Sequence, residues 1–145
     1  MPQADAASFW QLAGGGRRAL VPFLVAGILN VTPDSFSDGG RYLTPDAWLG
    51  RLRDIARQGA GMVDIGAEST RPGAEDIGPD EEWRRLAPAL ASALRLRLEP
   101  SPLPGPPVAI AVDTFRAATA AAALDIHRSL EPGCPPVDAV NDISG

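Results

Sequence analysis

The sequence predicts a protein of the α/β class, in which parallel strands are joined by crossover helices. Two features of the sequence carry this prediction. Short apolar stretches, typical of buried strands, alternate with longer segments whose apolar residues recur every three or four positions, typical of helices. Glycines and prolines, fifteen of each, interrupt the chain between many of these segments. Strands joined by crossover helices must pair in parallel.

The first predicted strand is VPFLVAGILNV, residues 21–31, with its proline near the start, where a strand tolerates one. A polar, glycine-rich loop follows it, and a helix is expected to begin at Thr44. Thr44 suits the N-cap, Pro45 the first helical position, and Asp46 the positive end of the helix dipole. Gly59 ends this helix.

The later elements repeat this pattern. A second strand leads through a polar loop to a helix with apolar residues at spacings of three and four, and the proline-rich EPSPLPGPP after it cannot be helix or central strand. An alanine-rich helix lies between the last two strands. The predicted elements are a strand at 62–67, a helix from Pro79 to about Leu94, a strand at 108–112, a helix from Arg116 to about Leu124 or on towards Leu130, and a strand at 138–143.

Side-chain parity favours a barrel over an open doubly wound sheet. Successive strand residues point to opposite faces, and in these strands one face carries small or polar side chains while the other carries larger aliphatic ones. A doubly wound sheet has helices on both faces and tends to be apolar on both, whereas a barrel interior can hold polar groups. We therefore expect a partial TIM (β/α)8 barrel, the first four parallel strands with their crossover helices, at residues 21–145. Residues 1–20 are expected to be a loose N-terminal leader.

Composition argues against several classes of function. The net charge is −5 and the basic residues are scattered, which argues against binding to nucleic acid or to an anionic membrane surface. No apolar run approaches the roughly 20 residues of a membrane span, and the N-terminus does not resemble a signal peptide. A single cysteine, Cys134, allows no internal disulfide. We expect a cytoplasmic protein whose partners are small molecules.

The ligand site of either architecture lies at the carboxyl ends of the strands. The predicted strands end in polar residues on the small, polar parity: Asn30, Glu68, Asp113 and Asn141. Four such residues at one level predict a pocket for a hydrogen-bonding ligand or a metal. The loops that follow the first two strands, TPDSFSDGGRY and STRPGAEDIG, exceed the usual length of about two to six residues, and long loops at this end tend to bind ligands.

Each of these residues also has a purely structural interpretation. Asn30 offers an amide oxygen suited to Mg²⁺, but it could simply cap the first loop. Asp113 could accept paired N–H donors of a heterocycle, or could cap the third helix in competition with Thr114. Asn141 offers a donor and an acceptor, or could be a turn residue at the strand end.

Other residues offer less. Glu68 and Asp64 fit a structural ion-pair network with Arg71 slightly better than a catalytic role. STRPG supplies hydroxyls, a guanidinium and a permissive backbone, a combination suited to a phosphate-bearing substrate, although it could also be a solvated loop. His127 fits a solvated helix surface, and Cys134 is assigned no role.

Four blocks of the sequence resemble dihydropteroate synthase. They follow the family's order on consecutive predicted strands, and the first two are long and specific. The blocks are GILNVTPDSFSDGG at 27–40, DIGAESTRPGA at 64–74, VDTF at 112–115 and NDISG at 141–145.

The resemblance implies a pterin-binding barrel that uses Mg²⁺ and condenses dihydropterin pyrophosphate with p-aminobenzoate to form dihydropteroate, a folate precursor. The aryl amine attacks a cationic pterin methylene as pyrophosphate leaves, so the enzyme positions groups and stabilises charge. A homodimer is possible for the full-length barrel. Carried over by residue, the resemblance implies metal and pyrophosphate binding by Asn30, pterin binding by Asp113 and Asn141, substrate contact by Thr70, Arg71 and Pro72, closure of the first loop by Phe36 and Asp38, and catalytic roles for Asp113, Asp38 and Arg71.

The chain departs from the family in length. A complete barrel of this type has about 250 residues, and later strands of the family bring a further pterin-binding Asp, a Lys and an Arg–His pair. We therefore expect a fragment that is inactive and marginally stable alone. Two alternatives remain open from the sequence: another pterin-binding barrel of the methyltetrahydrofolate methyltransferase type, and a non-catalytic half-barrel that binds a ligand or partner through its open edges.

Overall fold

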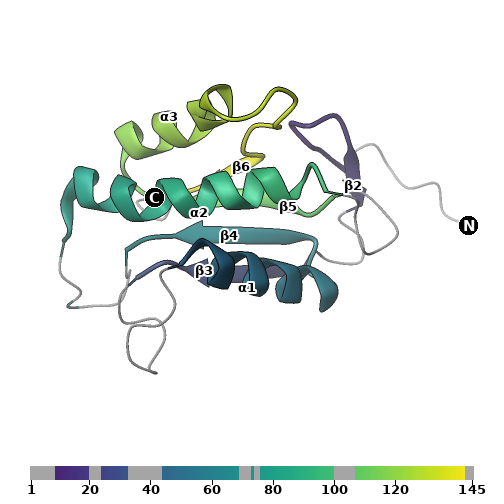
Figure 1. Cartoon of the computed structure of the whole chain (residues 1–145), viewed down its shortest axis with the longest axis horizontal. Helices are drawn as coiled ribbons and strands as arrows, with labels where there is room; N and C mark the ends of the chain where they lie inside the picture. The colour runs from purple at the N-terminus through teal and green to yellow at the C-terminus, as the bar shows by residue number, and fades with distance from the viewer. Residues whose placement is uncertain are drawn as a thin grey trace, which may run out of the picture.

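The computed structural model describes residues 9–19, 24–32, 44–68, 73, 76–99 and 107–142. Strands and helices alternate after an N-terminal hairpin (Figure 1). The elements are β1 (Phe9–Gln11), β2 (Arg17–Ala19), β3 (Ala26–Asn30), α1 (Pro45–Arg57), β4 (Met62–Gly66), α2 (Gly78–Leu96), β5 (Ala109–Asp113), α3 (Ala117–Asp125), the 3₁₀ helix η2 (Ile126–Ser129) and β6 (Ala139–Asn141).

The main sheet has four parallel strands in the order β3-β4-β5-β6, which confirms the predicted α/β class and connectivity. Sequential strand order is typical of a barrel wall, because a doubly wound sheet reverses its order at the switch point. Figure 1 shows α1 and α2 side by side along the same face of this sheet. The arrangement therefore corresponds to an arc of a (β/α) barrel with its helices outside.

A single core fills the space between the sheet and the helices. The aliphatic face of the strands is buried there, with Leu29, Ile65 and Val112 at most 1% exposed, and it packs against the leucines of α2. The other face of the sheet is open, and Ile28 on it is 65% exposed. Each fully buried large aliphatic side chain contributes about 1.5–3 kcal/mol, so this one-sided core accounts for much of the stability.

Three of the four main strands are shorter than the sequence predicts, whereas β5 keeps the predicted five residues, shifted by one position. β3 pairs with β4 from Ala26, opposite Met62, to Asn30, opposite Gly66. The paired part of β3 is therefore as long as β4. The adjoining residues 24, 25, 31 and 32 are outside the strand, and positions 21–23 lie outside the described residues. β6 pairs only with 111–113 of β5, which limits it to three residues instead of the predicted 138–143.

The helices begin close to the predicted positions. Thr44 is the N-cap of α1 with Pro45 in its first turn, although the Thr44 hydroxyl makes no capping hydrogen bond. Gly59 follows the end of α1 with φ of +90°, a conformation that glycine adopts without strain. α3 gives way to η2 at Ile126, so the predicted continuation towards Leu130 is a 3₁₀ turn. Across the described helices, none has the length and apolarity needed to cross a bilayer.

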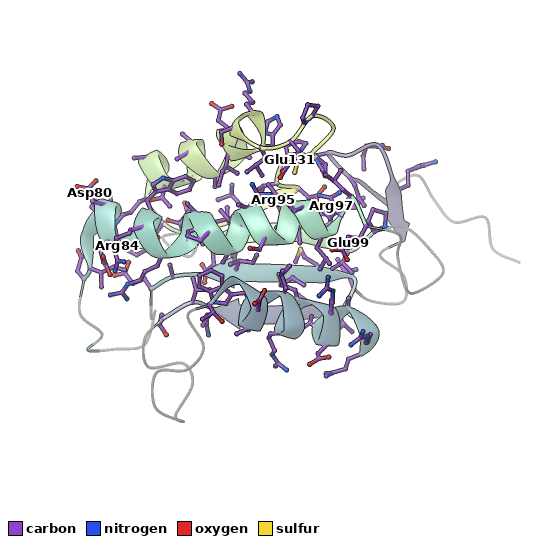
Figure 2. All side chains as sticks on the ribbon, viewed as in Figure 1. Asp80, Arg84, Arg95, Arg97, Glu99 and Glu131 are labelled. Atoms are coloured by element: carbon purple, nitrogen blue, oxygen red, sulfur yellow. The ribbon has the colours of Figure 1, made fainter. Side chains whose placement is uncertain are left out.

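The N-terminal segment contains an antiparallel hairpin, β1-β2, where the sequence analysis expects a loose leader. The hairpin lies at the amino-terminal end of the main strands (Figure 1), where its turn contacts the chain before β6. The Ala13 backbone N–H donates to Asp138 Oδ1 at 2.8 Å. Asp138 Oδ2 accepts from the Ile110 backbone and from Arg97 Nη1, each at 2.8 Å. One carboxylate thus joins the hairpin, β5 and the end of α2, where Arg97 lies (Figure 2).

Candidate functional site

A row of four residues crosses the carboxyl end of the sheet. The register pairs Asn30 with Gly66, Gly66 with Asp113, and Asp113 with Asn141. Residues paired in this way share one face of a parallel sheet, and here it is the face that the helices leave uncovered. The structure therefore brings together three of the residues predicted for the site, on three different strands.

Gly66 opens the space between Asn30 and Asp113. A Cβ atom at position 66 would lie 3.3 Å from both Cβ and Oδ2 of Asp113, and 3.7 Å from Oδ1 of Asn30. The Asp113 carboxylate thus leans over the glycine towards the centre of the row. The sequence analysis treats Gly66 only as a small residue of the inner face, because its role depends on which residue lies beside it.

Asp113 is half-buried at this surface. Burial raises the pKa of its carboxyl group, and the negative charges of Asp64 and Glu82 raise it further. A carboxylate in such surroundings gains free energy from any N–H donor that a ligand brings. Asp113 does not cap the third helix, whose N-cap is Arg116. This leaves its carboxylate available to a ligand on the open face.

Asn141 is held by a second carboxylate on the same face. Its Nδ2 donates to Asp64 Oδ2 at 2.9 Å, and Asp64 lies one level deeper, opposite Ala111. This bond fixes the orientation of the amide, because the nitrogen must face Asp64. The amide oxygen of Asn141 is then free to accept from a ligand, and Asp64 Oδ1 is buried with no hydrogen-bond partner in the described part of the chain.

Asn30 is the outermost polar residue of the row, on the exposed edge of β3. Its amide oxygen is a suitable ligand for Mg²⁺, which prefers oxygen donors and usually keeps several waters. Within the described ranges, no group of three or more His, Cys, Asp or Glu residues could hold a metal. Asn30 alone could supply one ligand to an Mg²⁺ ion, whose other ligands would have to come from water or a substrate.

A buried ion-pair network lies on the helix side of the row. The sequence analysis pairs Glu68 and Asp64 with Arg71, which lies outside the described residues. In the structure Glu68 pairs with Arg116, whose guanidinium also contacts Asp76 at 2.5 Å and Glu82 at 3.2 Å. The Arg116 side chain is 12% exposed.

Sequence reasoning missed Glu82, although the signal was present. Glu82 precedes Leu86, Leu90 and Leu94 by multiples of four, so it lies on the buried stripe of α2. A carboxylate on a buried stripe needs partners, and it was the one charged residue in that series. Its partners come from a distant part of the sequence and could not be identified from spacing.

Several predicted site residues cannot be placed. Phe36 and Asp38 of the first loop, and Thr70, Arg71 and Pro72 of the second, lie outside the described residues, so their roles stay predictions.

The two residues expected to have no catalytic role lie away from the row. The Nδ1 atom of His127 is 3.0 Å from the Leu124 carbonyl on the helix surface. Cys134 is buried, and burial is the main cause that raises the pKa of its thiol.

An apolar cavity of about 190 Å³ lies elsewhere, between the carboxyl ends of α1 and α2 and the amino ends of β4 and β5. Its lining includes Leu52, Val63, Leu96 and Val108. These residues are on the helix side of the sheet, so the cavity is separate from the polar row.

Comparisons with known proteins agree with this geometry. A family model described as "Pterin binding enzyme" matches residues 26–145. The dihydropteroate synthase of Bacillus subtilis is 43% identical over 122 residues, which are 84% of this chain and 36% of that protein. The dihydropteroate synthase of Mycobacterium leprae is 39% identical over 127 residues, which are 88% of this chain and 38% of that protein.

Solved structures give the same answer. A Xanthomonas albilineans dihydropteroate synthase with 4-aminobenzoic acid has a TM-score of 0.72 and 34% identity, covering 94% of this chain and 43% of that chain. A Burkholderia cenocepacia dihydropteroate synthase complexed with 7,8-dihydropteroate has a TM-score of 0.66 and 30% identity, covering 94% of this chain and 38% of that chain. The chain thus spans less than half of the length of each of these proteins. The family match and the polar row on the inner face together show that the chain belongs to the pterin binding enzyme family.

Proposed function

We propose that this chain provides the pterin-recognising wall of a dihydropteroate synthase. That transferase condenses dihydropterin pyrophosphate with p-aminobenzoate to give dihydropteroate in folate biosynthesis. The observation that carries the proposal is the row of Asn30, Gly66, Asp113 and Asn141 at the carboxyl end of the sheet. The names of the similar proteins support the choice of reaction.

Two residues of the row recognise the pterin ring. Asp113 accepts hydrogen bonds from two N–H groups of the pyrimidine part of the ring. These bonds offset the free-energy cost of burying the carboxylate beside Asp64. Asn141 accepts a ring N–H through its amide oxygen, because its nitrogen is held by Asp64. Paired donors and acceptors of this kind orient the ring and direct its methylene group towards the loops.

Asn30 binds the pyrophosphate end. Its amide oxygen would hold Mg²⁺ together with oxygens of the pyrophosphate, and the ion would neutralise negative charge on the leaving group. The C–O bond between the pterin methylene and pyrophosphate breaks, the amine nitrogen of p-aminobenzoate forms the new C–N bond, and that nitrogen loses a proton. No covalent bond to the protein is needed, so the residues act by position and charge.

The two loops complete the proposed site by resemblance to the family. Phe36 and Asp38 close over the substrate from the first loop, and Asp38 has a catalytic role there. The second loop supplies Thr70 and Pro72 as substrate contacts and the Arg71 guanidinium as a catalytic group that offsets the charge of the pyrophosphate. A cytoplasmic location and a homodimer of the full-length barrel belong to the same proposal.

Isothermal titration of the chain with 6-hydroxymethyl-7,8-dihydropterin pyrophosphate, with and without Mg²⁺, tests this function. We expect Mg²⁺ to tighten binding, and Asn30→Ala to remove that dependence while keeping the Mg²⁺-free affinity. Asp113→Asn should weaken binding under both conditions by about tenfold or more, because it replaces an acceptor of two N–H groups. Asp125→Asn, an exposed change on α3, is the control.

Two other results would contradict the proposal. Binding that is equally tight with and without Mg²⁺ would favour a pterin-binding barrel of the methyltetrahydrofolate methyltransferase type. A folded chain that binds no pterin at all would favour the non-catalytic half-barrel.

A further inference from the structure

A buried carboxylate lies directly behind the predicted ligand row. Glu82 of α2 is 1% exposed, and its two oxygens take three donors. Oε1 accepts the Thr114 hydroxyl at 2.7 Å, and Oε2 accepts the Thr119 hydroxyl at 2.5 Å and Arg116 Nη1 at 3.2 Å. A buried carboxylate needs partners of this kind, and with all of them in place it is held in one orientation.

Thr114 connects this carboxylate to the ligand row. It follows Asp113 directly, and its side chain points to the opposite, helix-covered face of the sheet, where it is 3% exposed. Its backbone N–H donates to the Asn141 carbonyl at 3.1 Å, and its hydroxyl also accepts the backbone N–H of Arg116 at 3.2 Å. Thr114 is thus fixed by contacts to β6, to α2 and to the start of α3.

We propose that Glu82 is a positioning residue for Asp113 and acts on it through the Thr114 hydroxyl. The inference rests on the proposed function, in which Asp113 recognises the pterin ring. Glu82 holds Thr114 against α2 and so fixes the end of β5. It thereby sets the direction of the Asp113 side chain, one residue earlier. The space for that side chain is narrow, because Asp113 leans over Gly66, where an added Cβ would lie only 3.3 Å from its Cβ and Oδ2.

The charge of Glu82 can be separated from its hydrogen bonds. The charged groups that act on Asp113 are Asp64 of β4 and Glu82 of α2, and both raise the pKa of the Asp113 carboxyl group after the larger effect of burial. Glu82→Gln keeps the size of the side chain and one acceptor oxygen, which serves the Thr114 hydroxyl when it faces β5, and removes the charge. The variant should therefore lower the Asp113 pKa and leave its carboxylate in place.

Thr114→Val and Thr119→Val form a matched pair of variants. Each removes one hydroxyl from Glu82, each preserves the shape of the side chain, and the two residues are 3% and 2% exposed. Thr114→Val also removes the acceptor of the Arg116 backbone N–H, so a merely structural role of the network predicts a larger loss of stability in that variant but no displacement of the Asp113 carboxylate in either. Positioning of Asp113 through Thr114 predicts that only Thr114→Val disturbs Asp113, with Thr114→Ser restoring the wild-type behaviour.

The experiment compares these variants in the 145-residue chain. We expect the urea midpoint to fall in both valine variants, and further in Thr114→Val, which also loses the bond from the Arg116 N–H. In the NMR spectrum, the side-chain carboxyl ¹³C signal of Asp113, which responds little to the type of the neighbouring residue, should shift in Thr114→Val and stay at its wild-type position in Thr119→Val. The Kd for the pterin pyrophosphate should rise about tenfold in Thr114→Val, because small displacements of a recognition group are costly, and less than about twofold in Thr119→Val.

Equal changes of the Asp113 carboxyl signal in the two valine variants would overturn the inference. So would a Thr114→Val chain whose Asp113 carboxyl signal matches the wild type. The NMR comparison needs no ligand, so it decides the positioning role even if the wild-type chain binds no pterin. Failure to bind would count against the proposed function instead.

Discussion

Gly66 lies between Asn30 and Asp113 in the row that crosses the carboxyl end of the sheet. Its lack of a side chain is what allows the Asp113 carboxylate to occupy the middle of the row. The neighbouring strand residues are held by the ladder, so an added methyl group at position 66 could only be accommodated by moving the Asp113 side chain or the strands.

Gly66→Ala should therefore damage the site more than the fold. An overpacked position of this kind costs about 1–3 kcal/mol in unfolding free energy, and the displaced Asp113 should weaken pterin binding by roughly tenfold. Gly50→Ala is the control, because nothing lies within 4 Å of a Cβ at that position of α1. That variant should gain up to about 1 kcal/mol from helix propensity. Urea unfolding and titration with the pterin pyrophosphate measure both effects, and unchanged binding in Gly66→Ala would contradict the expectation.

Asp113 should make stability depend on pH in an unusual direction. The pKa of its carboxyl group is higher in the folded chain than in the unfolded chain. At pH values between these two pKa values, the folded chain keeps a proton that the unfolded chain has lost. Stability therefore falls as pH rises through this range. Asp113→Asn removes the effect. Because the group is partly solvated, we expect the variant to be more stable at pH 7 by only about 0.5 kcal/mol, and equal to wild type near pH 3. Urea midpoints at the two pH values test this, and a less stable variant at pH 7 would contradict it.

At the scale of the elements, α2 carries two kinds of carboxylate. Glu81 is partly exposed and accepts from Arg84 and Arg85, whose hydrogen bonds lower its pKa to about 2. Glu82, the next residue, faces the core and binds the β5–α3 connection. The two side chains leave the helix in different directions. Glu81 therefore forms ion pairs at the surface, whereas Glu82 connects three elements in the core.

Glu82→Ala should lower the unfolding free energy by about 1–3 kcal/mol, because it leaves two buried hydroxyls without their acceptor, while Arg116 keeps its pairs with Glu68 and Asp76. Glu81→Ala is the matched control and should change the urea midpoint little at pH 7, because its ion pairs are solvated. Equal losses in the two variants would show that the buried network contributes no more than the surface pairs.

At the scale of the whole molecule, Asp138 links parts of the chain that are distant in sequence. Its carboxylate accepts from Ala13 in the hairpin, Ile110 in β5 and Arg97 after α2. The side chains of Arg97 and Asp138 are 5% and 2% exposed, so the ion pair is shielded from water. These contacts of Asp138 lie at the amino-terminal end of the sheet, at the opposite end from the predicted ligand row.

Asp138→Ala should lower the unfolding free energy by about 3–5 kcal/mol and release the hairpin, because the Arg97 charge remains buried without its partner. Hydrogen exchange at the Ala13 amide reports the release directly. Glu131→Ala, which removes the exposed pair with Arg95, should leave both measurements nearly unchanged. Retained protection of the Ala13 amide in Asp138→Ala would show that the hairpin is held by other contacts.

Local signals along the chain were sufficient to predict the order of the elements and the strand ends at which the polar row lies. Apolar periodicity, Thr44-Pro45-Asp46 and the glycines gave the alternation of strands and helices, because these signals are local. Strand parity placed Asn30, Asp113 and Asn141 on one face, and the register joins them in one row. Parity predicts the face because side chains alternate strictly along any strand.

The residues that support this row could be identified only from the folded chain. The contact of Gly66 with Asp113, the bond from Asn141 to Asp64 and the attachment of Thr114 to Glu82 all join segments that are far apart in the sequence. The hairpin inside the expected leader is likewise bonded to Asp138, more than a hundred residues away. Spacing along the chain cannot specify such partners, because they are chosen by the register of the strands and by the rotation of each helix on the sheet.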